Sequence, residues 1–302
     1  MTSPIIRPAA PGDLLALCGF VARRNAVPAS QSLHCAADTP AAVRAALREE
    51  GTFAEGWERA FTVAEAGEIV GAAGCQLDSE HTRGWLWGPW VEDARGWQSV
   101  APTLFDALLG RLPRSVRRVE AFLHAENRSG LRFLQARGGS LGALTHLYVA
   151  PRTAWTPGLA TTELFALLRP AHEVGFARLH AETFPAGGST PAELLLAGRD
   201  DEHAIFAATD GLRVLGYICA SINHAPHEGF IEYLAVRPAA RGRGLGARLV
   251  QTALRWVFEE CHLPQAALCV SEWRGNARRL YEAAGFQLAA SGIAARLTAT
   301  GR

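Results

Sequence analysis

Residues 232–246 read EYLAVRPAARGRGLG, and this stretch decides how the second half of the chain is expected to fold. Residues 230–236 are aliphatic or aromatic apart from one carboxylate, which predicts a largely buried strand. From Leu245 onward the apolar residues recur at helical spacing, so a helix is expected to begin there. The junction between them therefore predicts a tight, glycine-rich turn.

The residue types in this turn suit a negatively charged ligand. A helix start carries backbone N–H groups without intrahelical partners, and the macrodipole makes that end partly positive. Gly242, Gly244 and Gly246 let a ligand approach the backbone closely, and Arg241 and Arg243 add positive charge. The turn therefore predicts a site for a pyrophosphate or another polyanion, and a solvated turn is the alternative.

Two common nucleotide-binding loops do not fit this turn. The Gly-Lys-Ser/Thr of a Walker loop is absent, and Leu249 stands where a dinucleotide fingerprint needs its last glycine. The turn instead resembles the acetyl-CoA loop of the GCN5-related N-acetyltransferase (GNAT) superfamily. The residues that carry this resemblance are Val236, Pro238, Arg241, Gly244 and Gly246.

A second motif of the same superfamily lies downstream. Residues 280–286 read LYEAAGF and end a predicted helix after the predicted strand Ala266–Ser271. The resemblance extends from about Phe165 to Arg302. It implies an α/β (α+β) fold with a mixed, mostly antiparallel central sheet flanked by helices.

Composition narrows the class of protein further. The chain has 302 residues and a formal net charge of +1, which gives no electrostatic case for nucleic acid or anionic membranes. No apolar run has the length of a membrane span, and the N-terminus lacks a signal-peptide pattern, so a cytoplasmic protein is expected. The six cysteines form no C-x-x-C pair and are expected to be free thiols, without a metal site.

The sequence contains an internal repeat of one structural unit. Ile5–Ala9 corresponds to Leu167–Ala171, and a predicted hairpin at 61–77 corresponds to one at 204–222. We therefore expect two tandem GNAT-like domains at 1–150 and 161–302, joined by a linker at 151–160 that contains prolines and a glycine.

The first domain is expected to be a degenerate copy that does not bind coenzyme A. Its later glycines are missing, and Glu92 and Asp93 would repel an anion. Trp87 occupies the position of Glu232, and Leu134 occupies that of Tyr281.

Acetyl transfer from a thioester needs a base for the amine, a donor for the oxyanion and a proton for the leaving thiolate. Glu232, interpreted as sharing a strand face with Leu234 and Val236, is the predicted base. The resemblance implies that Tyr281 protonates the sulfur and that the Val236 N–H serves the oxyanion. The residues expected at coenzyme A are Leu234, Ala235, Val236, Arg241, Gly242, Arg243, Gly244, Leu245, Gly246 and Asn276.

One position departs from the family pattern, because Arg274 stands where members usually carry an asparagine that contacts pantetheine. The sequence as a whole predicts an acyltransferase that moves an acetyl group from acetyl-CoA to a small-molecule or peptide primary amine, as a monomer or homodimer. The alternatives are a glycoside-amine acetyltransferase with the tandem plan of mycothiol synthase and a non-catalytic CoA-binding scaffold. A dinucleotide or phosphate-sugar binder is a further rival.

Overall fold

A computed structural model describes residues 3–49, 52–53, 56–78, 82–157, 165–185, 188–224 and 227–299. The chain forms two compact units, which we call unit 1 (Met1–Thr145 with Ala290–Arg302) and unit 2 (His146–Ala289). Residues 158–164, which include the end of the expected linker and the start of the expected second domain, lie outside the described residues.

Unit 1 contains a sheet with the strand order β1-β2-β3-β4-β5-β12. β4 and β5 are parallel, whereas β1–β2, β2–β3, β3–β4 and β5–β12 are antiparallel. Its elements are β1 (Ile5–Pro8), α1 (Leu14–Asn25), α2 (Pro40–Arg48), α3 (Trp57–Ala60), β2 (Phe61–Glu65), β3 (Ile69–Leu77), β4 (Arg83–Val91), α4 (Gly96–Ser99), α5 (Ala101–Arg111), β5 (Arg118–His124), α6 (Arg128–Ala136) and the start of β6 (Ser140–Pro151).

Unit 2 repeats this plan with the strand order β6-β11-β10-β9-β8-β7. Again one central pair, β10 and β11, is parallel, and the pairs β7–β8, β8–β9 and β9–β10 are antiparallel. Its elements are β7 (Phe165–Leu167), α7 (Glu173–Thr183), α8 (Pro191–Ala197), β8 (His203–Asp210), β9 (Arg213–Asn223), β10 (Glu228–Val236), α9 (Leu245–Arg255), a π-helical turn (Trp256–Glu260), β11 (Gln265–Ser271), α10 (Gly275–Ala283) and the start of β12 (Gln287–Thr298).

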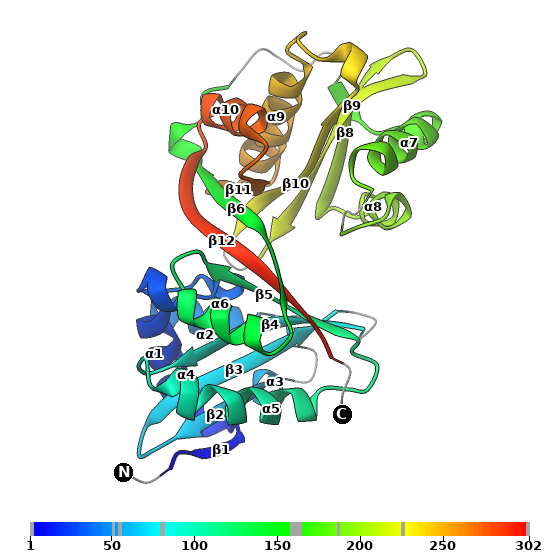
Figure 1. Ribbon diagram of the computed structural model, residues 1–302. Coiled ribbons are helices and arrows are strands. Elements are labelled where there is room, and N and C mark those ends of the chain that lie inside the picture. Colours follow the sequence, from blue (N-terminus) through cyan, green and yellow to red (C-terminus); the bar gives the residue numbers. More distant parts are fainter. Residues whose placement is uncertain are drawn as a thin grey trace. The chain divides into compact units, whose positions relative to one another are not determined.

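The two units exchange their last strands. β6 follows α6 of unit 1 but continues to Pro151 in unit 2, whereas β12 follows α10 of unit 2 and pairs with β5 of unit 1. Residues 290–302 therefore lie in unit 1, although the domain ranges expected from the sequence place them with the second half. The expected fold class, with a mixed and mostly antiparallel sheet flanked by helices, is confirmed (Figure 1).

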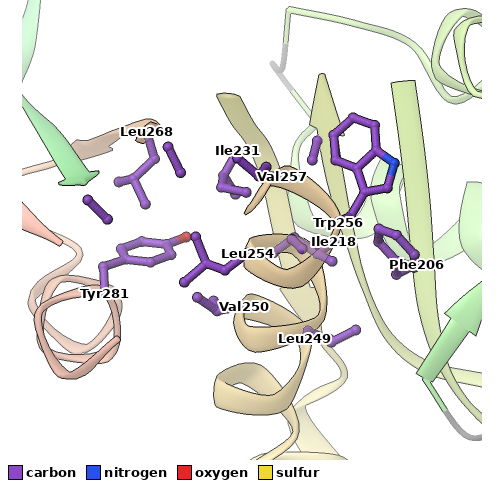
Figure 2. Packing of buried hydrophobic residues seen from close by; sticks show 14 of the residues in the cluster. Phe206, Ile218, Ile231, Leu249, Val250, Leu254, Trp256, Val257, Leu268 and Tyr281 are labelled. Carbon is purple, nitrogen blue, oxygen red and sulfur yellow. The ribbon is translucent and has the colours of Figure 1, made fainter. Parts of the chain in front are cut away.

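Each sheet is covered on both faces by helices. In unit 2, α9 and α10 cover one face and α7 and α8 cover the other (Figure 1). Figure 2 shows Leu249, Val250 and Leu254 of α9 in one buried cluster with Ile218 and Ile231 of the sheet. Because all five side chains are buried, this α9 face of the sheet is held rigidly against the helix start that follows β10.

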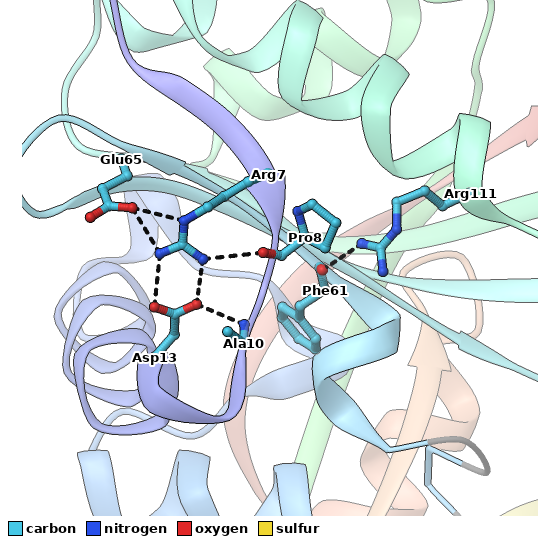
Figure 3. Close-up of polar contacts among 7 residues, drawn as sticks. All are labelled: Arg7, Pro8, Ala10, Asp13, Phe61, Glu65 and Arg111. Atoms are coloured by element: carbon cyan, nitrogen blue, oxygen red, sulfur yellow. Dashed lines mark hydrogen bonds and ion pairs between the residues drawn. The ribbon is translucent and has the colours of Figure 1, made fainter.

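The first strand of unit 1 is fixed by one arginine (Figure 3). Arg7 on β1 donates to the Glu65 carboxylate of β2 at 2.8 Å and to both Asp13 oxygens at 2.6 and 2.9 Å. The Arg7 hydrogen bonds are the main cause that lowers the pKa of Asp13. This bidentate contact ties the start of α1 to the edge strand.

Candidate functional site

The candidate site of unit 2 begins where its two parallel strands separate. β10 pairs with β11 only through Gly229–Ala266, Phe230–Ala267 and Ile231–Leu268. Beyond Ile231, β10 stays paired with β9 up to Val236, which lies opposite Gly216. The backbone of residues 232–236 therefore has one edge facing away from β9 that no described strand covers.

A β-bulge lies at this separation. Ile231 lies opposite Ala220 and Tyr233 opposite Cys219, so Glu232 is an inserted residue between these two pairs. Tyr233 packs among the side chains under α7 and α8, and the Glu232 charge contributes to the raised pKa of Cys219 after the larger effect of burial. Glu232 therefore belongs to the α7/α8 face of the sheet.

The bulge corrects the sequence interpretation of Glu232. Leu234 and Val236 pack against the cluster under α9, so they lie on the opposite face from Glu232. The alternation that the sequence suggested is interrupted at one residue, and that interruption turns the carboxylate towards the face that does not carry α9.

A second carboxylate on β10 was not identified from the sequence. The Glu228 side chain is buried and accepts hydrogen bonds from the amides of Asn223 at 3.5 Å and Gln265 at 3.0 Å. Burial raises the pKa of Glu228, although the two amides oppose this effect. A Cβ built on Gly229 would contact Val257, which belongs to the cluster under α9. Because successive residues of a strand face opposite sides of the sheet, Glu228 also lies on the α7/α8 face.

The turn after β10 has the geometry expected for an anion site. A single 3-10 turn at Pro238–Ala240 leads to Gly242 and Gly244, which both have φ of +75°, and α9 begins at Leu245. A Cβ on either glycine would meet no atom within 4 Å, so the space above them is open. Both the left-handed backbone and the openness favour glycine here.

The amides of this turn are left unused by the described residues. Arg248 N donates to Gly244 O at 3.2 Å, and no backbone acceptor is found for the N–H groups of residues 242–247 among the described residues. We call residues 241–246 the glycine turn. A row of free amides at a helix start is what an anionic group requires.

The two arginines of the glycine turn differ in their surroundings. Arg241 donates from Nε to Val236 O at 3.0 Å, so it lies back along the end of β10. Arg243 is exposed. Gly246 lies next to Leu280, because a Cβ there would be 3.3 Å from Leu280 Cδ2, and this close approach packs α9 against α10.

Tyr281 lies on α10 and is buried in the cluster under α9. Its ring extends from α10 towards Leu254 (Figure 2). The ring also meets Phe286 edge to face, with centroids 5.8 Å apart. Burial raises the pKa of Tyr281 to about 12, and the nearby charge of Arg274 opposes that rise. The phenol is therefore a proton donor throughout the neutral range.

The predicted pantetheine contact Asn276 is exposed near the start of α10. Its Oδ1 accepts a hydrogen bond from Arg279 at 2.7 Å, so the side chain is directed along the helix. A cavity of about 300 Å³ is found beside β7 and β8 and contains none of the predicted site residues.

Two searches of the described residues bear on other functions. No group of three or more His, Cys, Asp and Glu side chains in the described ranges could hold a metal ion. Among the described helices, none combines the length and the apolar character that a membrane crossing requires.

In unit 1 the strands separate at the equivalent place, but a segment of the chain fills the gap. β4 pairs with β5 up to Leu86–Ala121, so Trp87 is the first residue past the separation. Residues Gln31–Cys35, which we call the plug segment, lie between the two strands. Ser32 forms a bridge with Leu123 of β5, and its Oγ accepts from Gly88 N of β4 at 3.2 Å.

Further hydrogen bonds hold the plug segment in place. His34 Nδ1 lies 3.1 Å from Leu86 O, and Gln31 O accepts from the buried Asn127 side chain at 3.2 Å. Asn25 Oδ1 accepts from Ser32 N at 3.1 Å and from Trp90 Nε1 at 2.9 Å. The plug segment is thus hydrogen-bonded to both separated strands and to Asn25 and Asn127.

The turn after β4 is also satisfied internally. Gly96 N donates to Asp93 Oδ1 at 2.9 Å, and Gln98 N and Ser99 N donate to Arg95 O at 2.9 and 3.1 Å. A Cβ on Gly96 would lie 2.8 Å from the Val91 side chain, so this glycine is packed rather than open.

Comparison with known proteins places these features in context. Residues 161–286 match the family described as Acetyltransferase (GNAT) family. No curated protein sequence matches the chain.

Several solved structures are similar over almost the whole chain. A GCN5-related N-acetyltransferase from Sphaerobacter thermophilus has a TM-score of 0.68 at 19% identity, covering 98% of this chain and 96% of its own. A tandem GNAT protein from the clavulanic acid biosynthesis pathway, without AcCoA, has a TM-score of 0.55 at 14% identity, with coverages of 99% and 98%. A putative acetyltransferase from Pyrococcus horikoshii has a TM-score of 0.57 at 13% identity, with coverages of 99% and 90%. At these identities the likeness is one of fold.

Proposed function

The chain belongs, through residues 161–286, to the acetyltransferase (GNAT) family, and from that premise we propose that unit 2 transfers an acetyl group from acetyl-CoA to a primary amine. The family uses acetyl-CoA as its acyl donor. The assignment to unit 2 rests on its open glycine turn, which lies beside an uncovered strand edge. At the equivalent places in unit 1, the turn is bonded internally and the plug segment fills the strand edge.

We place the diphosphate of coenzyme A on the amides of the glycine turn. The unpartnered N–H groups of residues 242–247, the positive end of α9 and the exposed Arg243 all favour a negative group there. The pantetheine arm then follows the uncovered edge of residues 234–236 as an added strand would. Amides along that edge are positioned to donate to the thioester oxygen.

The proposed chemistry is direct attack by the amine in a ternary complex. The amine must lose a proton before it attacks, because an alkylamine is mostly protonated at neutral pH. Glu232 is the proposed base, since the bulge places it at the strand separation on the face opposite α9. As the carbon–sulfur bond breaks, Tyr281 gives its proton to the leaving thiolate, and its high pKa keeps that proton available.

Glu228 has a different proposed role. Its carboxyl is buried and held by two amides before the strands separate, so it is less accessible to an acceptor than Glu232. We assign it to fixing the start of the strand pair rather than to proton transfer.

The proposal is tested by supplying the full-length protein with acetyl-CoA and a panel of primary amines and measuring the free thiol that is released. The assay is run in a Cys269→Ser background, because Cys269 is the exposed cysteine among the described thiols. Turnover that depends on the amine supports the enzyme. Saturable CoA binding with no release of thiol for any amine would instead favour a non-catalytic CoA-binding protein.

A further inference from the structure

The guanidinium of Arg274, a residue that follows β11, lies close to two aromatic rings. Arg274 precedes α10, and its backbone N–H donates to Ser271 O at 3.0 Å. Its Cζ lies 4.8 Å from the centroid of the Trp273 ring and 5.2 Å from that of Phe184. Two rings restrict where this long side chain can lie, so the charge is presented in a defined position.

This arginine connects the two strands that separate at the site. Phe184 ends α7, and its ring centroid lies 5.1 Å from that of Tyr233 on β10. Tyr233 Oη accepts a hydrogen bond from Ser189 N at 3.1 Å, which fixes the ring. Arg274 therefore reaches from the end of β11 to the α7 side of β10, the same face that carries Glu232.

The charge of Arg274 is not neutralised within the described part of unit 2. No carboxylate among the described residues forms an ion pair with it, although its side chain is only partly exposed. Its charge is also felt at Tyr281, the proposed proton donor. A permanently charged, oriented guanidinium beside a reaction centre is suited to receive a planar anion.

We propose that Arg274 binds a carboxylate of the acceptor, so that the substrates are amines that also carry a carboxylate group. The inference rests on the proposed function of unit 2. Arg274 and Glu232 have opposite charges on one face of the sheet, so an amino acid-like acceptor would place its amine at Glu232 and its carboxylate at Arg274. An acceptor with additional positive charge would be repelled by Arg274.

The geometry favours the acceptor over coenzyme A as the partner of this arginine. Phe184 packs with the side chains under α7 and α8, whereas the glycine turn leads into α9 on the other face. The diphosphate already has the free amides of that turn. Arg274 is thus a specificity-determining residue for the acceptor, distinct from the cofactor contacts.

The experiment compares matched acceptors in the full-length protein. Glycine, β-alanine, 4-aminobutyrate and 6-aminohexanoate are each compared with the corresponding carboxamide. The series varies the spacing between the amine and the carboxylate, and each pair keeps the amine while removing the carboxylate charge. We measure kcat/KM for each member with acetyl-CoA, and the KM for acetyl-CoA, in wild type, Arg274→Gln and Arg274→Lys. Arg213→Gln is the matched control, since it removes an exposed arginine at the start of β9.

For at least one spacing, wild type should favour the carboxylate over its amide by about 10- to 100-fold, the range of a charge-assisted, bidentate contact. Arg274→Gln should abolish this preference through the acceptor KM while the acetyl-CoA KM stays constant. Arg274→Lys should retain part of the preference, and Arg213→Gln all of it.

Three outcomes overturn the inference. Equal kcat/KM for the acids and their amides in wild type would show that the protein does not recognise the carboxylate. A preference for the acid that persists in Arg274→Gln would show that another residue recognises the carboxylate. A rise in KM confined to acetyl-CoA would assign Arg274 to cofactor binding. In each of these cases amines are still acetylated, so the proposed function stands. If no amine is acetylated by wild type, both the function and this inference fail.

Discussion

The two units separate their central parallel strands at equivalent places and use the gap in opposite ways. In unit 1, the plug segment bridges Leu123 and receives the amide of Gly88, and the turn after β4 directs Gly96 N to its own Asp93. In unit 2, no described strand covers the edge of residues 232–236, where Val236 O accepts from Arg241 Nε, and no described backbone acceptor is found for the amides of residues 242–247. Backbone groups at such a gap need a partner from the protein, a ligand or water, because unpaired backbone groups away from water are costly.

This difference teaches how a duplicated fold divides its work. In unit 1, the plug segment forms hydrogen bonds with the separated strands within the folded protein. Unit 2 leaves the same groups without a described strand or backbone partner, and our proposal is that coenzyme A binds them. The predictions below test this contrast.

The largest effect is expected from Gly244→Glu. The substitution places a negative charge at the open glycine turn, and CoA affinity should fall by about 100-fold or more because two negative groups would face each other. Binding is measured by titration calorimetry or by the thermal shift that CoA produces.

The hairpin glycine Gly211 offers the control for this variant. It has φ of +59° and, like Gly244, open space around it, so Gly211→Glu carries a similar backbone cost without facing the ligand. Loss of CoA binding in Gly211→Glu but not in Gly244→Glu would contradict the assignment of the glycine turn.

Removal of the Asn25 side chain should unfold the plug of unit 1. Asn25 is buried and bonds Ser32, Trp90, Cys35 and Ala37, so Asn25→Ala should lower the free energy of unfolding by about 3 kcal/mol. Denaturant titration measures the loss. The CoA affinity of the folded variant should match wild type, and a large decrease in that affinity would mean that unit 1 takes part in binding.

Tyr281→Phe should lower kcat by about 10- to 100-fold, because the leaving thiolate loses its proton donor. CoA affinity and Tm should change little, since the ring and its contact with Phe286 remain. With the pKa of Tyr281 raised to about 12, wild-type kcat should show no decline from deprotonation of this group below about pH 10. Unchanged kcat in the variant would remove Tyr281 from the mechanism.

The smallest effect is expected from Glu228→Gln, and it is one of pH-dependent stability. Burial raises the pKa of Glu228 in the folded protein, so its contribution to stability is complete below the pKa of the unfolded chain. That contribution is lost as the pH rises through the raised pKa, because the buried group becomes charged. The variant should have a higher Tm than wild type at pH 8, and the two should converge near pH 4.

Glu232→Gln separates stability from chemistry in the same assays. It should lower turnover by about 10²-fold or more, because the amine loses its proposed base. If Glu228→Gln removed activity and Glu232→Gln did not, the roles assigned to the two carboxylates would be reversed.

Local patterns predicted much of the fold. The hairpin expected at Phe61–Glu65 and Ile69–Leu77 is present as β2 and β3 with those bounds. Alternation and turn residues act over a few neighbours, so they can be read directly from the chain. The predicted start of a helix at Leu245 is likewise confirmed, because glycine in the left-handed region ends one element and admits the next.

Other features depend on contacts between distant residues. The bulge at Glu232 comes from its register with Cys219, and no pattern within β10 marks it. The plug segment is a short polar stretch whose role depends on Leu123 and Gly88, far along the chain. Glu228 lies outside the strand predicted at residues 230–236, and its surroundings depend on Asn223 and Gln265 at the ends of neighbouring strands.

The exchange of β6 and β12 sets the order in which the protein can be completed during synthesis. Unit 1 requires the pairing of Leu297 with Val119, so it cannot be completed before Leu297 has been synthesised. Unit 2 takes its first strand from chain that was made before it, and has all of its own strands by Ala289. The half of the gene that is translated first therefore encodes the unit that finishes folding last.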